Sequence, residues 1–428
     1  MTGTREHLPR KLTITMWDFS WYTMTMPDEP YHDLGARFKE AVERGYNTIR
    51  VCAMPCFLFP NGGGPRTEPL RFSNLGMVGV RTRWYNCQGG AELDGTAHLL
   101  KLFEEAKKHD CYIILTSWEY QQSPSFLKTP ELFEELLAVP PEQRFLYVAR
   151  SMDRLVSFAK DAGYGDRIAY VELHNELEYG RLNQVALDAG VAESNTSGII
   201  RRMKPYVEEA IAYLRERHPD VLATGCYTLN DPYPKAHVPD NEQVAHFHLY
   251  INGVLQELME ATGIRNPDVP FPNPLVQSLL REGAPPFAEY DLPEGEEWRL
   301  HGNPVGLKLL YLHDWADPVK WDLYLYERYG AHRLAMLQKI DERLDEAAEW
   351  AIDRGLPVVI GEGYVGYTPL YAQFEEGPVG KSIAEYAVRK GMKLGFWGMV
   401  LCSNCAPHHP FWADVEWQRK WNRYILES

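Results

Sequence analysis

The sequence has 428 residues, 45% of them hydrophobic and 24% charged, and a formal net charge of −15. A chain of this length can form one large α/β barrel with insertions or roughly two to three ordinary domains. Because Lys and Arg are nowhere clustered, the acidic charge argues against nucleic acid or an anionic membrane as the main partner. No apolar run is long enough to span a bilayer and the first residues lack the apolar core of a signal peptide, so a cytoplasmic protein is expected.

The seven cysteines are too few and too scattered for a disulfide framework, and their odd number leaves at least one thiol unpaired. Cys402 and Cys405 have the spacing of redox and zinc sites, but no second pair accompanies them and no thioredoxin-like βαβ unit surrounds them. We interpret them as incidental thiols and expect neither a metal nor another cofactor.

Short apolar runs rich in β-branched and aromatic residues alternate with amphipathic stretches, the pattern of parallel strands joined by crossover helices. Eight strands are expected, at residues 11–19, 47–54, 111–118, 168–175, 221–227, 244–250, 357–363 and 394–400. Helices are expected at 31–45, 98–109, 141–163, 198–218, 332–355 and 379–391. Between the fifth and sixth strands only the turn-rich stretch 230–243 is found, so one crossover helix is expected to be vestigial or missing.

This repeat is most economically a single (β/α)8 TIM barrel over residues 1–428. The alternative is a doubly wound open sheet, but no GxGxxG or P-loop motif follows any strand. Two segments interrupt the repeat, a Gly- and Pro-rich loop at 55–95 and a longer insertion at 251–330. Both are expected to emerge at the carboxyl ends of the strands, where barrel active sites lie, and the second is expected to form a lid.

The fourth expected strand runs into a loop with the sequence IAYVELHNELEYG, residues 168–180. Strand alternation puts one set of side chains on the inward face: Tyr170, Glu172, His174 and Glu176. Asn175 falls on the opposite face. A buried acid must be paired, so Glu172, the deeper one, is expected to hold a hydrogen-bond network together. Glu176 lies at the mouth of the barrel, and Glu178 follows in the loop without an assigned role.

The seventh strand ends in an apolar run followed by Glu362 between Gly361 and Gly363. Small neighbours allow a ligand to approach this carboxylate, although it could also be the ion-pair partner of Arg50 at the end of the second strand. Glu176 and Glu362 would then end two strands of one barrel. Two carboxylates across a cleft are what cleavage of a glycosidic bond requires.

These residues resemble glycoside hydrolase family 5 and the wider clan A of retaining glycosidases, which share the barrel. The E-x-x-N-E motif of the fourth strand is matched by residues 172–176, and the GE that ends the seventh strand is matched at Glu362. The resemblance implies that Glu176 is the general acid/base, that Glu362 is the nucleophile and that Asn175 binds the sugar 2-hydroxyl.

Further matches follow in the same order along the chain. The second strand's G-x-N-x-[VI]-R appears as GYNTIRV, which would place Arg50 beside the nucleophile, and the sixth strand's H-x-Y appears as His248 and Tyr250. The Trp that closes the eighth strand corresponds to Trp397. Together with Trp118 it would form the floor on which the apolar face of a sugar stacks.

Three features depart from the family: Leu177 stands where Pro is frequent, the first strand lacks the usual glycine and asparagine, and the third ends in Trp118 and Glu119 rather than His. The departures bear on subfamily and substrate more than on the reaction. Arg50 and Tyr250 are expected to keep the nucleophile ionised. A less polar pocket and the charge of the nucleophile are expected to raise the pKa of the acid/base.

Two histidine pairs allow other interpretations. His246 and His248 point to one side of their strand, as in metal-dependent barrel hydrolases, but no Lys or Asp on the later strands is placed to complete such a site. His408 and His409 follow the eighth strand and would either border the cleft or cap a loop.

The sequence therefore predicts a retaining β-glycosidase that acts on small β-linked glycosides or oligosaccharides, with an exo preference if the 251–330 insertion closes one end of the cleft. The alternatives are an endo-acting glucanase or mannanase of the same clan and a carbohydrate-binding barrel without catalysis. A carbohydrate is the expected partner, and the sequence specifies neither the sugar nor the oligomeric state.

Overall fold

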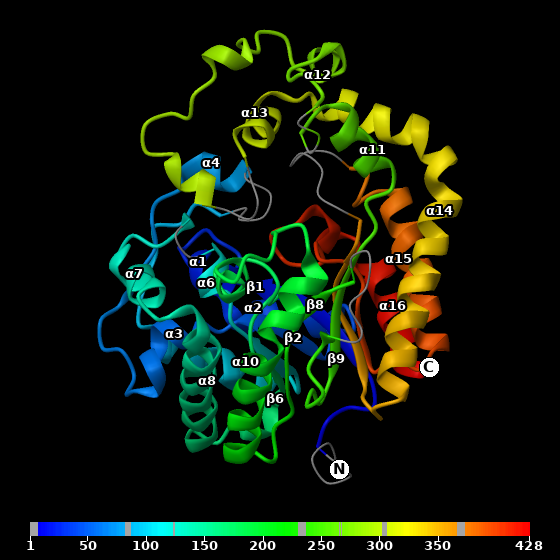
Figure 1. The fold of residues 1–428 in the computed structure, drawn as a ribbon. Helices are drawn as coiled ribbons and strands as arrows, with labels where there is room; N and C mark the ends of the chain where they lie inside the picture. Colours follow the sequence, from blue (N-terminus) through cyan, green and yellow to red (C-terminus); the bar gives the residue numbers. More distant parts are fainter. Residues whose placement is uncertain are drawn as a thin grey trace.

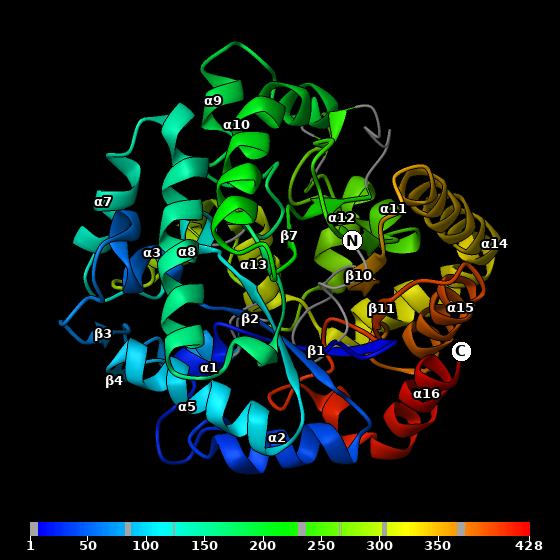
Figure 2. The ribbon, with the colours of Figure 1, turned by 90° about the horizontal axis from the view of Figure 1, so that it is seen from below.

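The structure, a computed structural model, describes residues 7–81, 87–122, 125–229, 237–264, 266, 268–301, 306–365 and 373–428. Parallel strands occupy the centre, and long helices surround them when the molecule is viewed from below (Figure 2). Irregular segments and several short helices cover the other end of the barrel, which is at the top in Figure 1. Among these residues, no helix has both the length and the apolar character needed to cross a membrane.

The central sheet has nine parallel strand segments in the order β7-β6-β5-β2-β1-β11-β10-β9-β8. Their bounds are β1 Leu12–Asp18, β2 Thr48–Cys52, β5 Tyr112–Thr116, β6 Ile168–Glu172, β7 Ala223–Thr224, β8 Tyr227–Thr228, β9 Ala245–Tyr250, β10 Val358–Tyr364 and β11 Gly398–Val400. The eight strands expected from the sequence are all present, the fifth as two pieces. The strand interiors are buried, and the barrel interior includes charged and polar side chains such as Arg50, Glu172 and His246.

The broken fifth strand closes the barrel. Its first piece, β7, pairs with β6, and its second piece, β8, pairs with β9, so the two ends of the nine-segment sheet are consecutive parts of one chain segment. The break falls at Gly225, where a Cβ atom would lie only 2.7 Å from Leu177 Cδ1. The predicted (β/α)8 barrel is thus confirmed.

Seven long helices cover the strands: α2 Leu34–Glu43, α5 Gly95–Lys108, α8 Arg144–Asp161, α10 Thr196–Arg217, α14 Pro318–Ile352, α15 Pro378–Lys393 and α16 Val415–Glu427. Asp317 caps α14 by accepting from Val319 N, and Pro318 suits the first turn, so this helix begins well before the expected residue 332. Residues 237–244, the described part of the connection between the fifth and sixth strands, contain no α-helix, as expected.

Shorter elements complete the chain: α1 Ser20–Thr23, α3 Pro55–Leu58, β3 Leu70–Arg71, α4 Gly76–Arg81, β4 Glu92–Leu93, α6 Glu119–Gln122, α7 Glu131–Leu137, α9 Gln184–Leu187, α11 Val254–Ala261, α12 Pro274–Leu279 and α13 Leu307–Trp315. The small antiparallel pair β3–β4 belongs to the 55–95 segment. The segment 251–330 supplies α11, α12 and α13 and, from Pro318, the first turns of α14. Helix α4 of the first segment and helices α11, α12 and α13 of the second lie at the same end of the barrel (Figure 1).

Candidate active site

Arg50 on β2 is the centre of a buried network at the carboxyl ends of the strands. Its side chain binds Glu172 with two hydrogen bonds, Nε to Oε2 at 2.9 Å and Nη2 to Oε1 at 2.6 Å. Nη1 donates to Glu362 Oε1 at 2.9 Å, and Nη2 also reaches Asn175 Oδ1 at 2.6 Å. One guanidinium thus joins strands two, four and seven through the planar geometry that suits carboxylates.

Glu172 is the structural acid of this network, as predicted. It also accepts from Thr116 Oγ1 at 2.8 Å, and no part of it is exposed. Burial alone would raise its pKa, but the adjacent Arg50 guanidinium outweighs burial and lowers the pKa of Glu172 to about 2. The carboxylate is therefore ionised throughout the physiological range and is fully engaged with protein donors.

Glu362, near the end of β10, is the second partner of Arg50. Tyr250 OH donates to its Oε2 at 2.7 Å, and His248 Nδ1 lies 3.6 Å from its Oε1. The three neighbours fix the orientation of the carboxylate, and the residue is 4% exposed. The sequence left two roles open for Glu362, an ion-pair partner of Arg50 or a reactive carboxylate. The structure shows the ion pair and also places Glu362 near the carboxyl end of β10, at the barrel mouth.

Glu176 follows the end of β6 in a left-handed backbone conformation, with φ at +43°. His248 Nδ1 lies 2.9 Å from its Oε1. Burial raises the pKa of Glu176 to about 7, with a further contribution from Glu172 and an opposing one from Arg50. Burial therefore raises the pKa of Glu176 as predicted. The neighbouring charge that raises this pKa further is that of Glu172, whereas the prediction named Glu362.

His248 connects the two mouth glutamates. One oxygen of Glu176, one oxygen of Glu362 and a ring nitrogen of His248 all lie within 4.8 Å of one another. Burial lowers the pKa of His248 to about 4, so its ring is neutral at pH 7. The Cys226 thiol lies 3.2 Å from Nε2, and burial raises the pKa of this thiol, which makes it the donor. His248 Nδ1 then carries the proton and donates to Glu176.

The pKa of Glu176 gives a testable pH dependence. If this group acts as an acid, kcat/KM is expected to fall as pH rises through about 7, because the proton that it must donate is lost above its pKa. Rates of wild type and of Glu176→Gln should be compared across pH with substrates of good and poor leaving groups. The basic limb should disappear in Glu176→Gln.

A buried acid outside the site provides the control for this profile. Burial also raises the pKa of Glu242 to about 7, but its carboxylate binds Thr224 Oγ1, Gly225 N and Tyr227 OH. Glu242→Gln should keep the wild-type limb. A wild-type profile that stays flat to pH 9, roughly two units above this pKa, would contradict the acid role of Glu176.

Asn175 lies in the network although strand alternation had put it on the other face. The strand ends at Glu172, so the period of two no longer applies beyond that residue. Asn175 Nδ2 also donates to Gln121 Oε1 at 3.2 Å. His174, expected to point inward with the acids, instead places Nδ1 2.7 Å from the Asn175 carbonyl and its ring 6.5 Å from that of Tyr120.

Trp397 is at the wrong end of the barrel to bind substrate, so this prediction is wrong. Its backbone carbonyl accepts from Leu12 N and its N–H donates to Val358 O, and both partners are the first residues of their strands. The indole Nε1 donates to Pro9 O at 3.1 Å. The run from Leu394 to Val400 is apolar throughout, and β11 occupies only its last three residues, so Trp397 precedes the strand instead of closing it.

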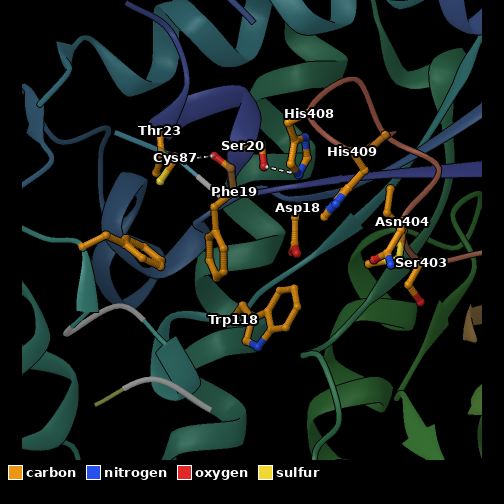
Figure 3. Close-up of a pocket in the computed structure, with 13 residues that line it drawn as sticks. Asp18, Phe19, Ser20, Thr23, Cys87, Trp118, Ser403, Asn404, His408 and His409 are labelled. Atoms are coloured by element: carbon orange, nitrogen blue, oxygen red, sulfur yellow. Dashed lines mark hydrogen bonds between the residues drawn. The ribbon is translucent and has the colours of Figure 1, made fainter. Parts of the chain in front are cut away.

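A cavity opens at the carboxyl end of β1 (Figure 3), and its lining includes neither Glu176 nor Glu362. It is lined by Met16, Asp18, Phe19, Ser20, Thr23, Cys87, Trp118, Phe126, Ser403, Asn404, Ala406, His408 and His409. Trp118 therefore borders the cavity as expected, with its ring 5.0 Å from that of Phe19. His408 and His409 also line the cavity, which agrees with the first of the two roles considered for them, bordering a cleft or capping a loop.

Substitutions of Trp118 and Trp397 should have different effects, the first on KM and the second on stability. Trp118→Ala is expected to raise KM by roughly 3- to 10-fold through loss of aromatic contact with a sugar. Trp397→Phe should leave KM unchanged and lower the free energy of unfolding by about 1 kcal/mol, because it removes the hydrogen bond to Pro9. Steady-state kinetics and urea denaturation measure both effects, and a raised KM in Trp397→Phe would contradict the placement.

Ser403 occupies the position at the end of the eighth strand that had been assigned to Trp397. Its Oγ lies 2.9 Å from Tyr250 OH and accepts from Gly363 N at 2.9 Å.

Asp18, at the end of β1, was missed by the sequence analysis, although it is a polar residue closing an apolar strand, the same signal that identified Glu362.

Cys226, His246 and His248 are the described residues that best resemble a metal site. One donor atom from each lies within 4.8 Å of the others, and all three are buried. However, the donors of Cys226 and His248 are already bound to each other. Burial lowers the pKa of His246 to about 3 and raises the pKa of Cys226 well above its usual value, so Cys226 is a thiol rather than the thiolate that binds metals.

The sequence matches the Cellulase-like family, described as sugar-binding cellulase-like, over residues 14–231 and 314–426. The chain belongs to this family. The match covers well over half of the sequence and leaves out most of the 251–330 insertion. This membership confirms the resemblance to cellulase-like barrels that the strand-end motifs had indicated. None of the curated proteins is similar enough in sequence to count as a relative.

Solved structures share the barrel at low sequence identity. A proposed glycoside hydrolase from Parabacteroides distasonis is 18% identical, with a TM-score of 0.68 over 97% of this chain and 94% of the other. A glycoside hydrolase family 5, subfamily 18 protein from Bifidobacterium longum, bound to Manβ1-4GlcNAc, is 11% identical, with a TM-score of 0.51 over 97% of this chain and 78% of the other. A family 5, subfamily 4 endo-β-1,4-glucanase from Bacillus licheniformis is 11% identical, with a TM-score of 0.50 over 99% and 61%.

Proposed function

We propose that this cellulase-like protein is a retaining glycoside hydrolase that cleaves β-glycosidic bonds of small glycosides or oligosaccharides. The observation that carries the proposal is the approach of Glu176 and Glu362 to within 4.8 Å, oxygen to oxygen, at the mouth of the barrel. Retaining enzymes hold their carboxyl groups about 5 to 5.5 Å apart, whereas inverting enzymes leave room for a water molecule between them.

In the first step Glu362 attacks the anomeric carbon while the glycosidic C–O bond breaks. Arg50 and Tyr250 hold the two oxygens of the nucleophile, so that it meets the substrate in one orientation. Glu176 gives its proton to the leaving oxygen. Its raised pKa supports this role, because about half of the Glu176 carboxyl groups still carry the proton at pH 7.

In the second step Glu176, now a carboxylate, takes a proton from a water molecule that attacks the anomeric carbon. The bond to Glu362 breaks and the sugar leaves with its original configuration. His248, hydrogen-bonded to Glu176 and anchored by Cys226, keeps the acid/base in place through both steps. Asn175, which is fixed by Arg50 and Gln121, is the proposed ligand of the sugar 2-hydroxyl.

An exo-acting enzyme in the cytoplasm is the form of this activity that we favour. The helices of the 251–330 segment lie at the same end of the barrel as the glutamates and are suited to a lid that closes one end of the cleft (Figure 1). A cytoplasmic enzyme meets imported glycosides and short oligosaccharides, which fit such a closed cleft, rather than polymers.

The stereochemistry of the product tests the proposal directly. Wild type should be screened against nitrophenyl β-glycosides and short β-linked oligosaccharides, and the anomer first released from the best substrate should be followed by NMR. A β-product released before mutarotation supports retention, and an α-product would contradict it. Release of internal fragments from oligosaccharides would favour endo over exo action, and no hydrolysis across the panel would favour a sugar-binding barrel without catalysis.

A further inference from the structure

Asp18 is a half-buried residue with a buried carboxylate oxygen, and the reaction above does not use it. It ends β1, where the register with β2 shifts between Met16 and Asp18, and its φ is +52°. A bulge of this kind re-aims a side chain at a strand end. Figure 3 shows the Asp18 carboxyl group pointing toward the Trp118 ring, with Phe19 on one side and Asn404 on the other.

No protein group satisfies this carboxylate fully. Its Oδ1 is buried and has no hydrogen-bond partner within the described parts of the chain. No Lys or Arg lines the cavity. Burial raises the pKa of Asp18 well above its usual value, and the charge of Glu362 raises it further. Unpaired buried acceptors are rare in native proteins, so an acceptor without a partner beside an open cavity indicates a ligand that donates hydrogen bonds.

The cavity adjoins the reacting atoms. Ser403, which lines it, is bonded to Tyr250 OH, and this hydroxyl donates to Glu362. A sugar ring in the cavity therefore has its anomeric carbon on the side of Glu362 and its other hydroxyls on the side of Asp18. The aromatic rings of Phe19 and Trp118 provide an apolar surface for the ring.

We infer that Asp18 is a specificity-determining residue that accepts hydrogen bonds from hydroxyl groups of a neutral sugar, and that the cavity around it excludes anionic sugars. This inference rests on the proposed function for the placement of the sugar. Acidic sugars, such as uronic acids and sugar 6-phosphates, would bury a negative charge in a cavity whose lining has no Lys or Arg to pair with it.

Binding of free monosaccharides tests the inference without requiring turnover. Titration calorimetry should use glucose, galactose and mannose, their singly deoxygenated derivatives and their 6-phosphates, with wild type, Asp18→Asn and Asp28→Asn. Asp28 is exposed in the loop after α1, so Asp28→Asn is the same chemical change outside the cavity. Loss of a hydrogen bond to this poorly hydrated acceptor is expected to weaken binding by roughly 10- to 100-fold.

The expected result is that wild type and Asp28→Asn bind one neutral sugar and reject its 6-phosphate. Asp18→Asn should bind that sugar roughly 10- to 100-fold more weakly, and removal of one hydroxyl should produce the same loss in wild type but none in Asp18→Asn. Unchanged affinity in Asp18→Asn, equal binding of the 6-phosphate, or no sugar binding at all would overturn the inference. If the pattern holds but no glycoside is hydrolysed, the proposed function fails and the assignment of Asp18 stands.

Discussion

Glu362→Gly is expected to lose hydrolytic activity by roughly 10⁴-fold or more, because the reaction then lacks the group that forms the covalent intermediate. Azide should restore turnover of an activated β-glycoside by attacking from the side that the carboxylate occupied. The product would be the glycosyl azide of inverted configuration. Nitrophenol release and NMR of the azide product measure both effects.

Glu176→Ala, the matching variant at the acid/base, is expected to give a glycosyl azide of the opposite configuration. In Glu176→Ala the intermediate still forms from substrates with good leaving groups, and azide then attacks it to give a glycosyl azide of retained configuration. Glu294→Gly, an exposed position in the 251–330 segment, should behave as wild type. If the inverted azide arises from Glu176→Ala and the retained one from Glu362→Gly, the two roles must be exchanged.

Replacement of Arg50 is expected to have the largest effect on stability. Arg50→Met leaves Glu172 and Glu362 buried without their cation, and breaking a buried ion pair in this way destabilises proteins by about 3 to 5 kcal/mol. Arg50→Lys keeps the charge but cannot reproduce the two-point contact with Glu172, so an intermediate loss is expected. Urea denaturation at pH 7 measures the free energy of unfolding of each variant.

The pH dependence of stability makes the Arg50 test specific. The folded-state pKa of Glu172, about 2, is below the ordinary value of 4.5, so its ion pair stabilises the fold above that ordinary value. This stabilisation is lost as pH falls from about 5 toward 2. Arg50→Met should lose this part of the acid dependence. A variant with wild-type stability and an unchanged acid profile would show that the network contributes little.

The activity of Arg50→Lys also helps to distinguish an enzyme from a carbohydrate-binding barrel without catalysis. Arg50 holds both Glu362 and Asn175, so a misplaced guanidinium disturbs the nucleophile and the ligand of the 2-hydroxyl together. A binding protein has no need for a nucleophile held by an arginine and a tyrosine at once. A strong loss of kcat with a folded Arg50→Lys variant would therefore favour catalysis over binding alone.

Local patterns were sufficient for the eight strands, for six of the long helices and for the glutamates, whereas α16 and the first turns of α14 were not predicted. The eight strands and six helices were predicted from short apolar runs and the 3.6-residue period, because these signals depend only on neighbours in sequence. Glu362 follows an apolar run at a strand end and Glu176 lies just beyond another strand, and parallel strands of one barrel bring such ends together. Their positions could therefore be predicted without knowing a single distance.

The tertiary structure decided which groups share the site. The apolar run that includes Trp397 contains no signal for where the strand begins, and pairing with β1 and β10 starts only at Gly398, which leaves the indole at the far end. Asn175 enters the network because the strand stops at Glu172. The bulge that turns Asp18 into the cavity arises from a register shift between two strands. Register and strand ends depend on partners remote in sequence, so no local pattern determines them.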